Sequence, residues 1–269
     1  MGVKRREFLK LAGLTVAAVG ATPAAHILLG GAGEAAAEEK AAPAVLSAGR
    51  HWAMVVDTRK LTHEDIELAV RACHQTHNVP DIRLPNGEKD LRHEVKWVWA
   101  DEFENVFPEQ YTPNQPEFLK DKEFLVLCNH CDNPPCCRVC PTQATYKRED
   151  GIVVMDMHRC IGCRFCMAGC PYGSRSFNWG DPRIFFKDGR PSNPAYPTRM
   201  KGVVEKCNFC AERLAQGQYP ACVEACESGA LAFGDLSSPS SEVNRLIREN
   251  YTIRRKPSLG TGPNIFYLV

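Results

Sequence analysis

The spacing of the cysteines constrains this chain more than any other feature of its sequence. The 269 residues include 14 cysteines, all of them between Cys73 and Cys226. The segment Cys160–Pro171 reads Cys-x2-Cys-x2-Cys-x3-Cys-Pro, with cysteines at Cys160, Cys163, Cys166 and Cys170. Such short steps let one loop give three thiolates to a cubane iron–sulfur cluster, while the fourth thiolate reaches a neighbouring cluster. A zinc ribbon uses paired Cys-x2-Cys knuckles only, so this motif predicts an iron–sulfur cluster rather than zinc.

Two further cysteine sets lie on either side of this motif. A looser version, Cys-x2-Cys-x4-Cys-x3-Cys-Pro, uses Cys128, Cys131, Cys136 and Cys140. Cys137 is left over, because using it in place of Cys136 would break the x3 step, and we interpret it as a buried free thiol. His130 is expected to be a loop residue that hydrogen-bonds locally rather than a ligand. The third set consists of Cys207, Cys210, Cys222 and Cys226. Alone it would also suit a four-cysteine zinc site, but beside two ferredoxin motifs it favours a cluster.

A degenerate copy of the motif lies upstream. Residues Val55–Leu61 align loosely with Val154–Cys160, so that a leucine stands where the first cysteine should be. Further on, Cys73 matches Cys170, with two extra residues in the upstream copy. The first three cysteines of this copy are absent, and only the one that would reach a neighbouring cluster is kept.

The residues that replace those three cysteines predict a helix. Thr62 is a capping hydroxyl followed by acidic residues, which is typical of a helix start. The positions that then fall at helical spacing are Ile66, Ala69, Val70 and Cys73. The pattern therefore predicts an amphipathic helix with Cys73 on its buried face. Two alternatives are that Cys73 is only a small core residue, and that histidines complete a metal site there. Those histidines are His63, His74 and His77.

Residues 1–37 have the layout of an export signal. A basic segment, Lys4–Lys10, precedes a mildly apolar run, Leu11–Leu29, and Ala35–Ala37 follow. The Arg5-Arg6 pair resembles a twin-arginine signal, and a transmembrane anchor is the alternative. We expect export to the periplasmic or extracytoplasmic side of the cell membrane. The twin-arginine resemblance implies a protein exported already folded around cofactors, so we expect its cysteines to bind metal rather than to form the disulfides usual in exported proteins.

Composition excludes several classes of protein. The 33 Lys and Arg nearly balance the 32 Asp and Glu, which argues against bulk binding of nucleic acid. A mean hydropathy of −0.31 excludes a polytopic membrane protein. No nucleophile–base constellation, dinucleotide-binding glycine motif or P-loop supports independent catalysis. Residues 38–50 are expected to form an Ala-rich linker. Residues 51–269 are expected to form one loop-rich α+β unit with insertions at 81–125 and 176–206 and a tail, 237–269, that wraps the surface.

On these motifs the chain resembles the four-cluster ferredoxin-type subunits of membrane oxidoreductases, such as polysulfide, nitrite and dimethyl sulfoxide reductases. The resemblance runs roughly from Trp52 to Val269. It is carried by Cys128–Pro141, Cys160–Pro171, Lys206–Cys210 and Pro220–Cys226. In that family the second motif pairs with the third and the first with the fourth. The resemblance therefore implies two interleaved ferredoxin-like halves, one spanning 127–175 and the other combining 51–80 with 200–235.

The resemblance also implies three [4Fe–4S] clusters and their ligands. Set A consists of Cys128, Cys131, Cys136 and Cys170. Set B consists of Cys140, Cys160, Cys163 and Cys166. Set C consists of Cys73, Cys207, Cys210 and Cys222. A fourth cluster would need three cysteines that the first motif lacks, which leaves Cys226 without a cluster.

The missing cluster is the one that faces the molybdenum subunit in that family. The resemblance therefore implies a protein without such a partner, whose end near Cys128 and Cys170 faces a quinone-reactive membrane subunit of the polysulfide-reductase type. The region around Cys73 is further similar to the exported iron–sulfur subunit, subunit O, of the Dsr membrane complex of sulfur-metabolising microbes. There the other partner would be a multihaem cytochrome c.

The expected function is one-electron relay through three clusters between these partners. One alternative is a beta subunit that feeds a molybdopterin oxidoreductase or a hydrogenase, and another is a zinc-binding structural module. Four basic residues lie beside cluster ligands in the sequence: Lys206, Arg164, Arg138 and Arg159. They are expected either to raise cluster potentials, by stabilising the more negative reduced state, or only to solvate the surface.

Overall fold

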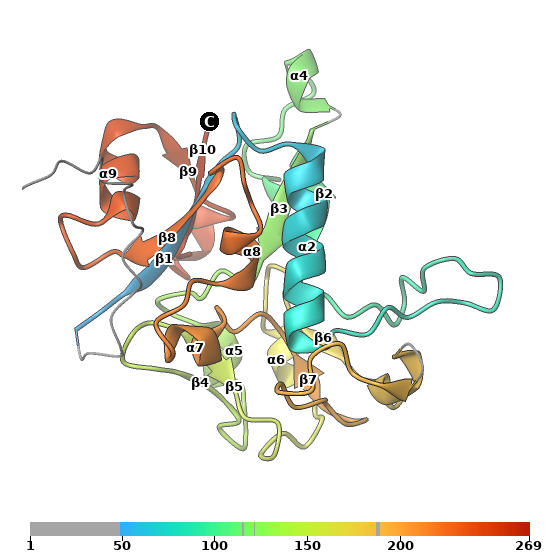
Figure 1. Cartoon of the computed structure of the whole chain (residues 1–269). Coiled ribbons are helices and arrows are strands. Elements are labelled where there is room, and N and C mark those ends of the chain that lie inside the picture. Colours follow the sequence, from blue (N-terminus) through green and yellow to red (C-terminus); the bar gives the residue numbers. More distant parts are fainter. Residues whose placement is uncertain (1–48, 115, 121, 187–188) are drawn as a thin grey trace, which may run out of the picture. The chain divides into compact units, whose positions relative to one another are not determined.

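The computed structural model describes residues 49–269 apart from residues 115, 121, 187 and 188, and Figure 1 shows their arrangement. These residues belong to one unit, Ala42–Val269. The predicted signal peptide and most of the predicted linker lie outside the described residues, so export stays a prediction. Within the described part of the chain, no helix has the length and apolar character that a membrane span requires.

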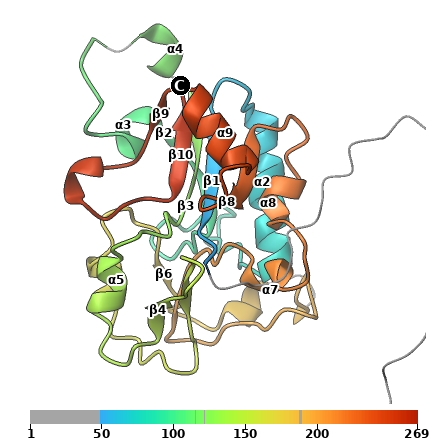
Figure 2. The same cartoon turned by 90° about the vertical axis from the view of Figure 1, so that its left-hand side faces the viewer.

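A four-stranded sheet in the order β8–β1–β10–β9 forms one side of the core. Its strands are β1 (Trp52–Asp57), β8 (Leu231–Asp235), β9 (Thr252–Ile253) and β10 (Ile265–Leu268). β1 runs parallel to β10 and antiparallel to β8. Every residue of β1 is buried, because α9 (Glu242–Glu249) covers one face of the sheet and the main core covers the other (Figure 2). This explains why the strand is almost continuously apolar.

The C-terminal tail was expected to wrap the surface, and this prediction is wrong. β10 lies between β1 and β9 and is buried along its whole length. Its sequence, Ile265–Leu268, is an apolar run of the kind that fills an interior strand. The hydroxyl of Tyr267 donates to the carbonyl of Leu125 at 3.0 Å, which ties the end of the chain to β3 (Glu123–Leu127).

The helix predicted in place of the first cysteine motif is α2 (His63–His77). The Thr62 side chain accepts a hydrogen bond from the Asp65 amide, and the Asp65 side chain accepts one from the Thr62 amide, which forms a capping box. The helix ends at Asn78, whose φ of 51° is left-handed. Its buried residues include Ile66, Ala69 and Cys73, so the predicted helix and its inward face are confirmed.

The remaining elements are short, as the loop-rich prediction required. Three antiparallel pairs join β2 (Val98–Glu102) with β3, β4 (Thr145–Lys147) with β5 (Val153–Met155), and β6 (Ser176–Phe177) with β7 (Val204–Glu205). The short helices are α3 (Phe103–Val106), α4 (Glu117–Lys120), α5 (Pro135–Arg138), α6 (Phe165–Ala168), α7 (Ala211–Leu214) and α8 (Ala221–Glu224). Two 3₁₀ turns cover Pro182–Phe185 and Pro257–Leu259. The described residues thus have mixed helix and small sheets, in agreement with an α+β fold.

A buried ion pair fastens the second insertion to the end of α2. The Arg199 guanidinium lies 2.7 Å from the Glu205 carboxylate, and both side chains are almost completely buried. Arg199 also donates to the carbonyls of His77 and Asn78, and the Trp97 indole donates to Glu205 at 2.7 Å. Removing one member of such a pair leaves an uncompensated buried charge.

We therefore expect Arg199→Ala to lower the free energy of unfolding by about 3–5 kcal/mol. The matched control is Arg183→Ala, which removes an exposed pair with Asp181 and should leave the free energy of unfolding nearly unchanged. Anaerobic denaturant unfolding followed by circular dichroism measures both. Equal losses for the two variants would contradict the structural role given to Arg199.

Candidate iron–sulfur sites

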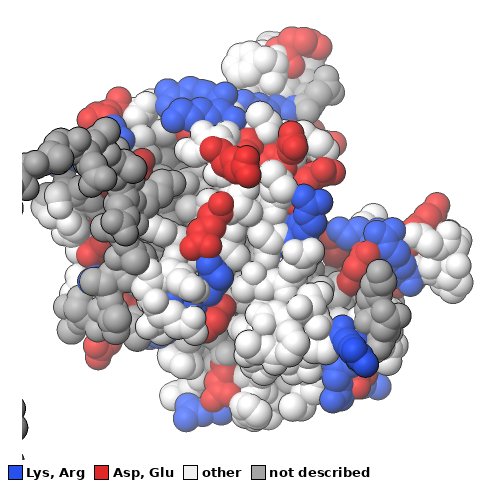
Figure 3. Space-filling view, viewed as in Figure 1, with Lys and Arg blue, Asp and Glu red and all other residues white. Residues whose placement is uncertain are grey.

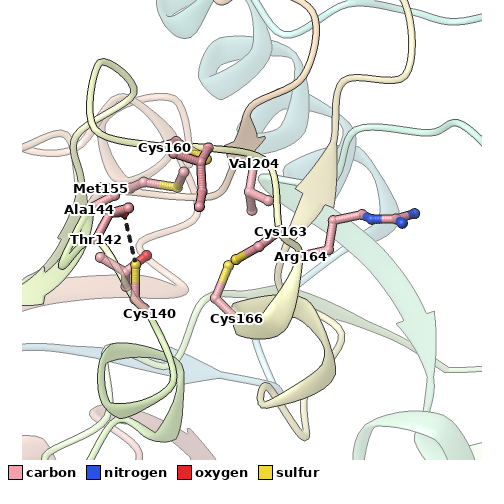
Figure 4. A pocket seen from close by; sticks show the side chains of 11 residues that line it. Cys140, Thr142, Ala144, Met155, Cys160, Cys163, Arg164, Cys166 and Val204 are labelled. Carbon is pink, nitrogen blue, oxygen red and sulfur yellow. Dashed lines mark hydrogen bonds between the residues drawn. The ribbon is translucent and has the colours of Figure 1, made fainter.

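The four cysteines of set B line one cavity. Cys160 and Cys163 lie in the loop before α6, Cys166 lies on α6, and Cys140 follows α5. In Figure 4 the side chains of Cys163 and Cys166 lie next to each other, and Cys140 and Cys160 occupy other walls. The loop can turn this tightly because Gly162 has a φ of +70°, and a Cβ there would lie 2.4 Å from the carbonyl oxygen of Gly202.

The four cysteines of set A line a second cavity. Cys128 and Cys131 follow β3, Cys136 lies on α5, and Cys170 follows α6. Burial, followed by the charge of Cys128, raises the pKa of Cys131 to about 12. The pKa of Cys136 is lowered to about 5, first by a hydrogen bond from the neighbouring thiol of Cys137 and then by the charges of Arg175 and Lys206.

The four cysteines of set C meet in the main core. Cys73 lies on α2, Cys207 and Cys210 precede α7, and Cys222 lies on α8. Cys73, Cys207 and Cys222 belong to one buried cluster, and burial, followed by the charges of Cys207, Cys210 and Cys222, raises the pKa of Cys73. Two backbone amides also point at these sulfurs: Phe209 donates to Cys207 at 3.5 Å and Ala221 donates to Cys210 at 3.4 Å. The membership of set C stays a prediction, because Cys128 and Cys226 belong to the same buried cluster.

The buried cysteines of the three sets are better suited to bind iron–sulfur clusters than to fill an apolar core. Buried thiols with raised pKa values stay protonated unless a cation stabilises the thiolates, and iron supplies that charge. Asn129 lines the set A cavity, and both polar atoms of its amide are buried without a partner in the described residues. The same holds for one guanidinium nitrogen of Arg175. The Asn129 amide nitrogen and this Arg175 nitrogen are unsatisfied donors, which fit the sulfur atoms of a bound cluster because these accept hydrogen bonds.

The three sets lie in a row with set A in the middle. The charge of Cys136 in set A acts on the thiol of Cys166 in set B, and the charge of Cys128 in set A acts on that of Cys207 in set C. Cys128 belongs to the same buried cluster as set C, whereas Cys136 belongs to the cluster that contains Cys166. The expectation that Cys128 and Cys170 mark one end of the row is therefore wrong. Pairing across motifs places them at its centre, and the Cys160 loop is the end.

Comparisons with known proteins support an iron–sulfur protein. A family model for a 4Fe-4S dicluster domain matches residues 122–185 and again 183–236. The Hdr-like menaquinol oxidoreductase iron–sulfur subunit 1 of Archaeoglobus fulgidus is 37% identical over 288 residues, covering 98% of this chain and 97% of the relative. The menaquinone reductase iron–sulfur cluster-binding subunit of Nitratidesulfovibrio vulgaris is 35% identical, covering 81% of this chain and 88% of that protein.

This protein belongs to the ferredoxin-type iron–sulfur electron-transfer subunits of oxidoreductases. A shorter similarity links it to the B subunit of polysulfide reductase from Wolinella succinogenes, which is 41% identical over 140 residues, or 52% of this chain and 63% of the relative. Iron–sulfur cofactors and a ferredoxin-like cysteine core are therefore properties of this protein. The assignment of each cysteine to a particular cluster stays a prediction.

The two leftover cysteines have different surroundings. Cys137 is only partly buried, and its thiol lies beside Cys136. It is not among the cysteines that line the set A and set B cavities. Cys226 is buried, and its thiol donates to the Asp65 carboxylate at 3.6 Å. Asp65 belongs to the capping box of α2, so the first turn of this helix contacts Cys226, the cysteine that a fourth cluster would have bound.

The surroundings of the histidines show which of their predicted roles hold. His63, His74 and His77 lie in the first and last turns of α2, and these described residues do not form a joint metal site. His77 is instead buried 2.7 Å from the Glu212 carboxylate, next to Cys210, and His63 pairs with the Glu123 carboxylate. His130 lies in a loop, as predicted, but its Nδ1 accepts from the amide of Val153, 23 positions away, at 3.1 Å. Its ring stacks on Phe209 with 3.7 Å between the ring centroids.

Of the four basic residues predicted to lie beside the clusters, only one is buried. Lys206 is buried, whereas Arg138, Arg159 and Arg164 are exposed. Figure 4 shows Arg164 pointing away from set B, and its guanidinium lies over Trp179. The sequence reasoning missed Arg175, which lies five positions after Cys170 and has no motif of its own. Its only sequence signal is a single basic residue in an otherwise uncharged stretch after the motif.

We expect Cys73→Ser to remove the set C centre alone. Iron should fall from about 12 to about 8 atoms per chain, because each cubane holds four. The matched control is Cys226→Ser, a buried cysteine assigned to none of the three sets, which should keep all the iron. Iron analysis and EPR of the anaerobically purified protein provide the measurement. Equal iron loss in both variants would contradict the assignment of Cys73.

Proposed function

We propose that this protein relays single electrons through three [4Fe–4S] clusters between a quinone-reactive membrane subunit and a second redox protein. The observation that carries the proposal is the convergence of twelve cysteines into three neighbouring groups, each of four thiols. A bound cubane cluster supplies reversible one-electron transfer. The protein's own residues fix the spacing of the centres, exclude water from set C and leave set B near the surface.

Strand pairing supports two interleaved ferredoxin-like halves. β4 follows the motif that ends at Cys140, β5 precedes the motif that begins at Cys160, and these two strands pair antiparallel. In the same way, β8 follows the third cysteine set, β1 precedes the helix that carries Cys73, and they pair antiparallel. Each half therefore joins the exit of one motif to the entrance of its partner motif.

The surface at the set B end suits a membrane-associated partner. Ile161 and Phe165 lie between set B cysteines in the sequence and are 67% and 60% exposed. Three exposed arginines, at positions 138, 159 and 164, accompany them. Exposed apolar side chains beside cluster ligands favour a protein interface, and basic residues suit the anionic surface of a membrane. The names of two relatives refer to menaquinol and menaquinone, which supports a quinone-reactive partner at this end.

Only the family resemblance supports the part of the proposal that concerns the partner at the set C end. A multihaem cytochrome c, a place in a sulfur-metabolism complex of the Dsr type and a periplasmic location follow from the first motif and the twin-arginine pattern. The face that carries α2 and α8 has acidic and basic side chains interspersed among its described residues (Figure 3). A beta subunit for a molybdopterin enzyme is less well supported, because α2 begins where a fourth cluster would need its ligands.

Metal analysis tests the number and kind of centres. We expect about 12 iron atoms and about 12 acid-labile sulfides per chain, with magnetic coupling between neighbouring centres in EPR. Zinc in place of iron would support the structural module instead, and about 16 iron atoms would support the four-cluster beta subunit. Either result would overturn the proposal.

We expect Phe165→Glu to slow reduction of the clusters by a menaquinol analogue such as menadiol in membranes that hold the intact complex. A charge inside a docking surface typically weakens binding about tenfold or more, and the iron content should not change. The control is Leu91→Glu, an exposed apolar residue of the first insertion. Stopped-flow bleaching of the cluster absorbance measures the rate. Equal rates for both variants would place the quinone-reactive partner elsewhere.

A further inference from the structure

Three buried cations have no carboxylate partner in the described residues: Arg175, Lys206 and Arg255, and the first two lie between cysteine sets. Arg175 is 5% exposed and Lys206 is 3% exposed. The Lys206 ammonium donates to the carbonyls of Val153 and Cys207, the second at 2.7 Å. The Arg175 guanidinium donates to the Thr145 hydroxyl at 3.1 Å, and its second terminal nitrogen has no partner in the described part of the protein. Burying a charge in this way is costly unless an opposite charge lies nearby.

Arg175 lies at the junction between sets A and B. Its side chain lines the set A cavity. The same side chain contacts Thr145 and the sulfur of Met155, and both of these residues line the set B cavity. The guanidinium therefore reaches from one cysteine set to the next.

Lys206 lies at the junction between sets A and C. One of its carbonyl partners belongs to Val153, which lines the set A cavity. The other belongs to Cys207, which is a member of set C. The stacked rings of His130 and Phe209 lie at the same junction, since His130 stands between two set A cysteines and Phe209 between two set C cysteines. Each junction of the row thus holds one buried cation of this pair, and only set A adjoins both.

The negative partner of these cations is the charge of the bound centres and their thiolates. Reduction adds one electron and makes a centre more negative, so a nearby cation stabilises the reduced state and raises the reduction potential. Set C has an opposing influence, because Glu212 lies near Cys210 and its charge raises the pKa values of Cys73 and Cys210. Set B adjoins Arg175 but lies nearer to solvent, which screens charges more strongly.

We propose that Arg175 and Lys206 give the centre held by set A the highest reduction potential of the row. An electron that enters at either end then rests at the middle centre before it moves on. This inference rests on the proposed relay function and adds the residues that set its energy profile.

The test is an EPR-monitored redox titration of the anaerobically purified full-length protein. The set A signal is assigned as the one that changes in Cys131→Ser. Arg175→Gln and Lys206→Met remove the charges, and in each variant the ratio of reduced to oxidised set A at a fixed potential should fall at least about tenfold, which is about 59 mV for a one-electron couple. Arg175→Lys and Lys206→Arg keep the charges and should restore most of the shift. Arg164→Gln, which removes an exposed charge, should leave the set A midpoint unchanged.

The outcomes separate this inference from the function on which it rests. A full iron content with an unmoved set A midpoint in both charge-removing variants would overturn the inference and leave the relay intact. If those variants lose iron, the three midpoint potentials of the unmodified protein provide the test instead. The inference requires the midpoint potential of set A to be the highest of the three. Absence of clusters from the unmodified protein would overturn the proposed function itself.

Discussion

The rest of the structure depends on holding many thiols inside a protein core. Cys73, Cys128, Cys207 and Cys222 share one buried cluster with the strands and helices of the main core. Burial is the largest cause that raises the pKa of such thiols, which reaches about 12 for Cys222. Bound iron makes their thiolates stable and links segments far apart in the sequence, such as α2 and α8. Cofactor binding and folding are therefore coupled, because the ligands come from separate segments that only the folded protein assembles.

The start of α2 occupies the place where a cluster-binding loop would have its first three cysteines. Three absent cysteines are replaced by a capped helix, and the Thr62–Asp65 capping box satisfies the backbone where a cluster-wrapping loop would have ended. The helix keeps Cys73 on its inward face for set C, and Asp65 accepts a hydrogen bond from Cys226. A polar contact thus satisfies the thiol of Cys226, and Cys73 stays in the buried cluster that holds Cys207 and Cys222.

The sequence predicted the local features of the site better than its long-range order. The cysteine motifs implied, through the family resemblance they carry, which thiols lie together, and the periodicity after Thr62 predicted α2 from residues close together in the sequence. It did not predict that set A lies in the middle, since that depends on how the two halves pack. It also missed β10 and Arg175. A four-residue apolar strand near the C-terminus and a single arginine outside a motif carry no local pattern that distinguishes them from surface residues.

The positions of charge and apolar surface make the two ends of the row physically different. Set B lies beside exposed apolar side chains and close to solvent, so a partner can approach its centre closely. Set C is enclosed by α2, α7 and α8, with the partly exposed Glu212 carboxylate nearby. A partner that exchanges electrons with set C must therefore dock over these helices rather than touch the cysteines. A basic surface on such a partner would meet Glu212 favourably there, so the same carboxylate that opposes reduction of set C would also attract a basic partner.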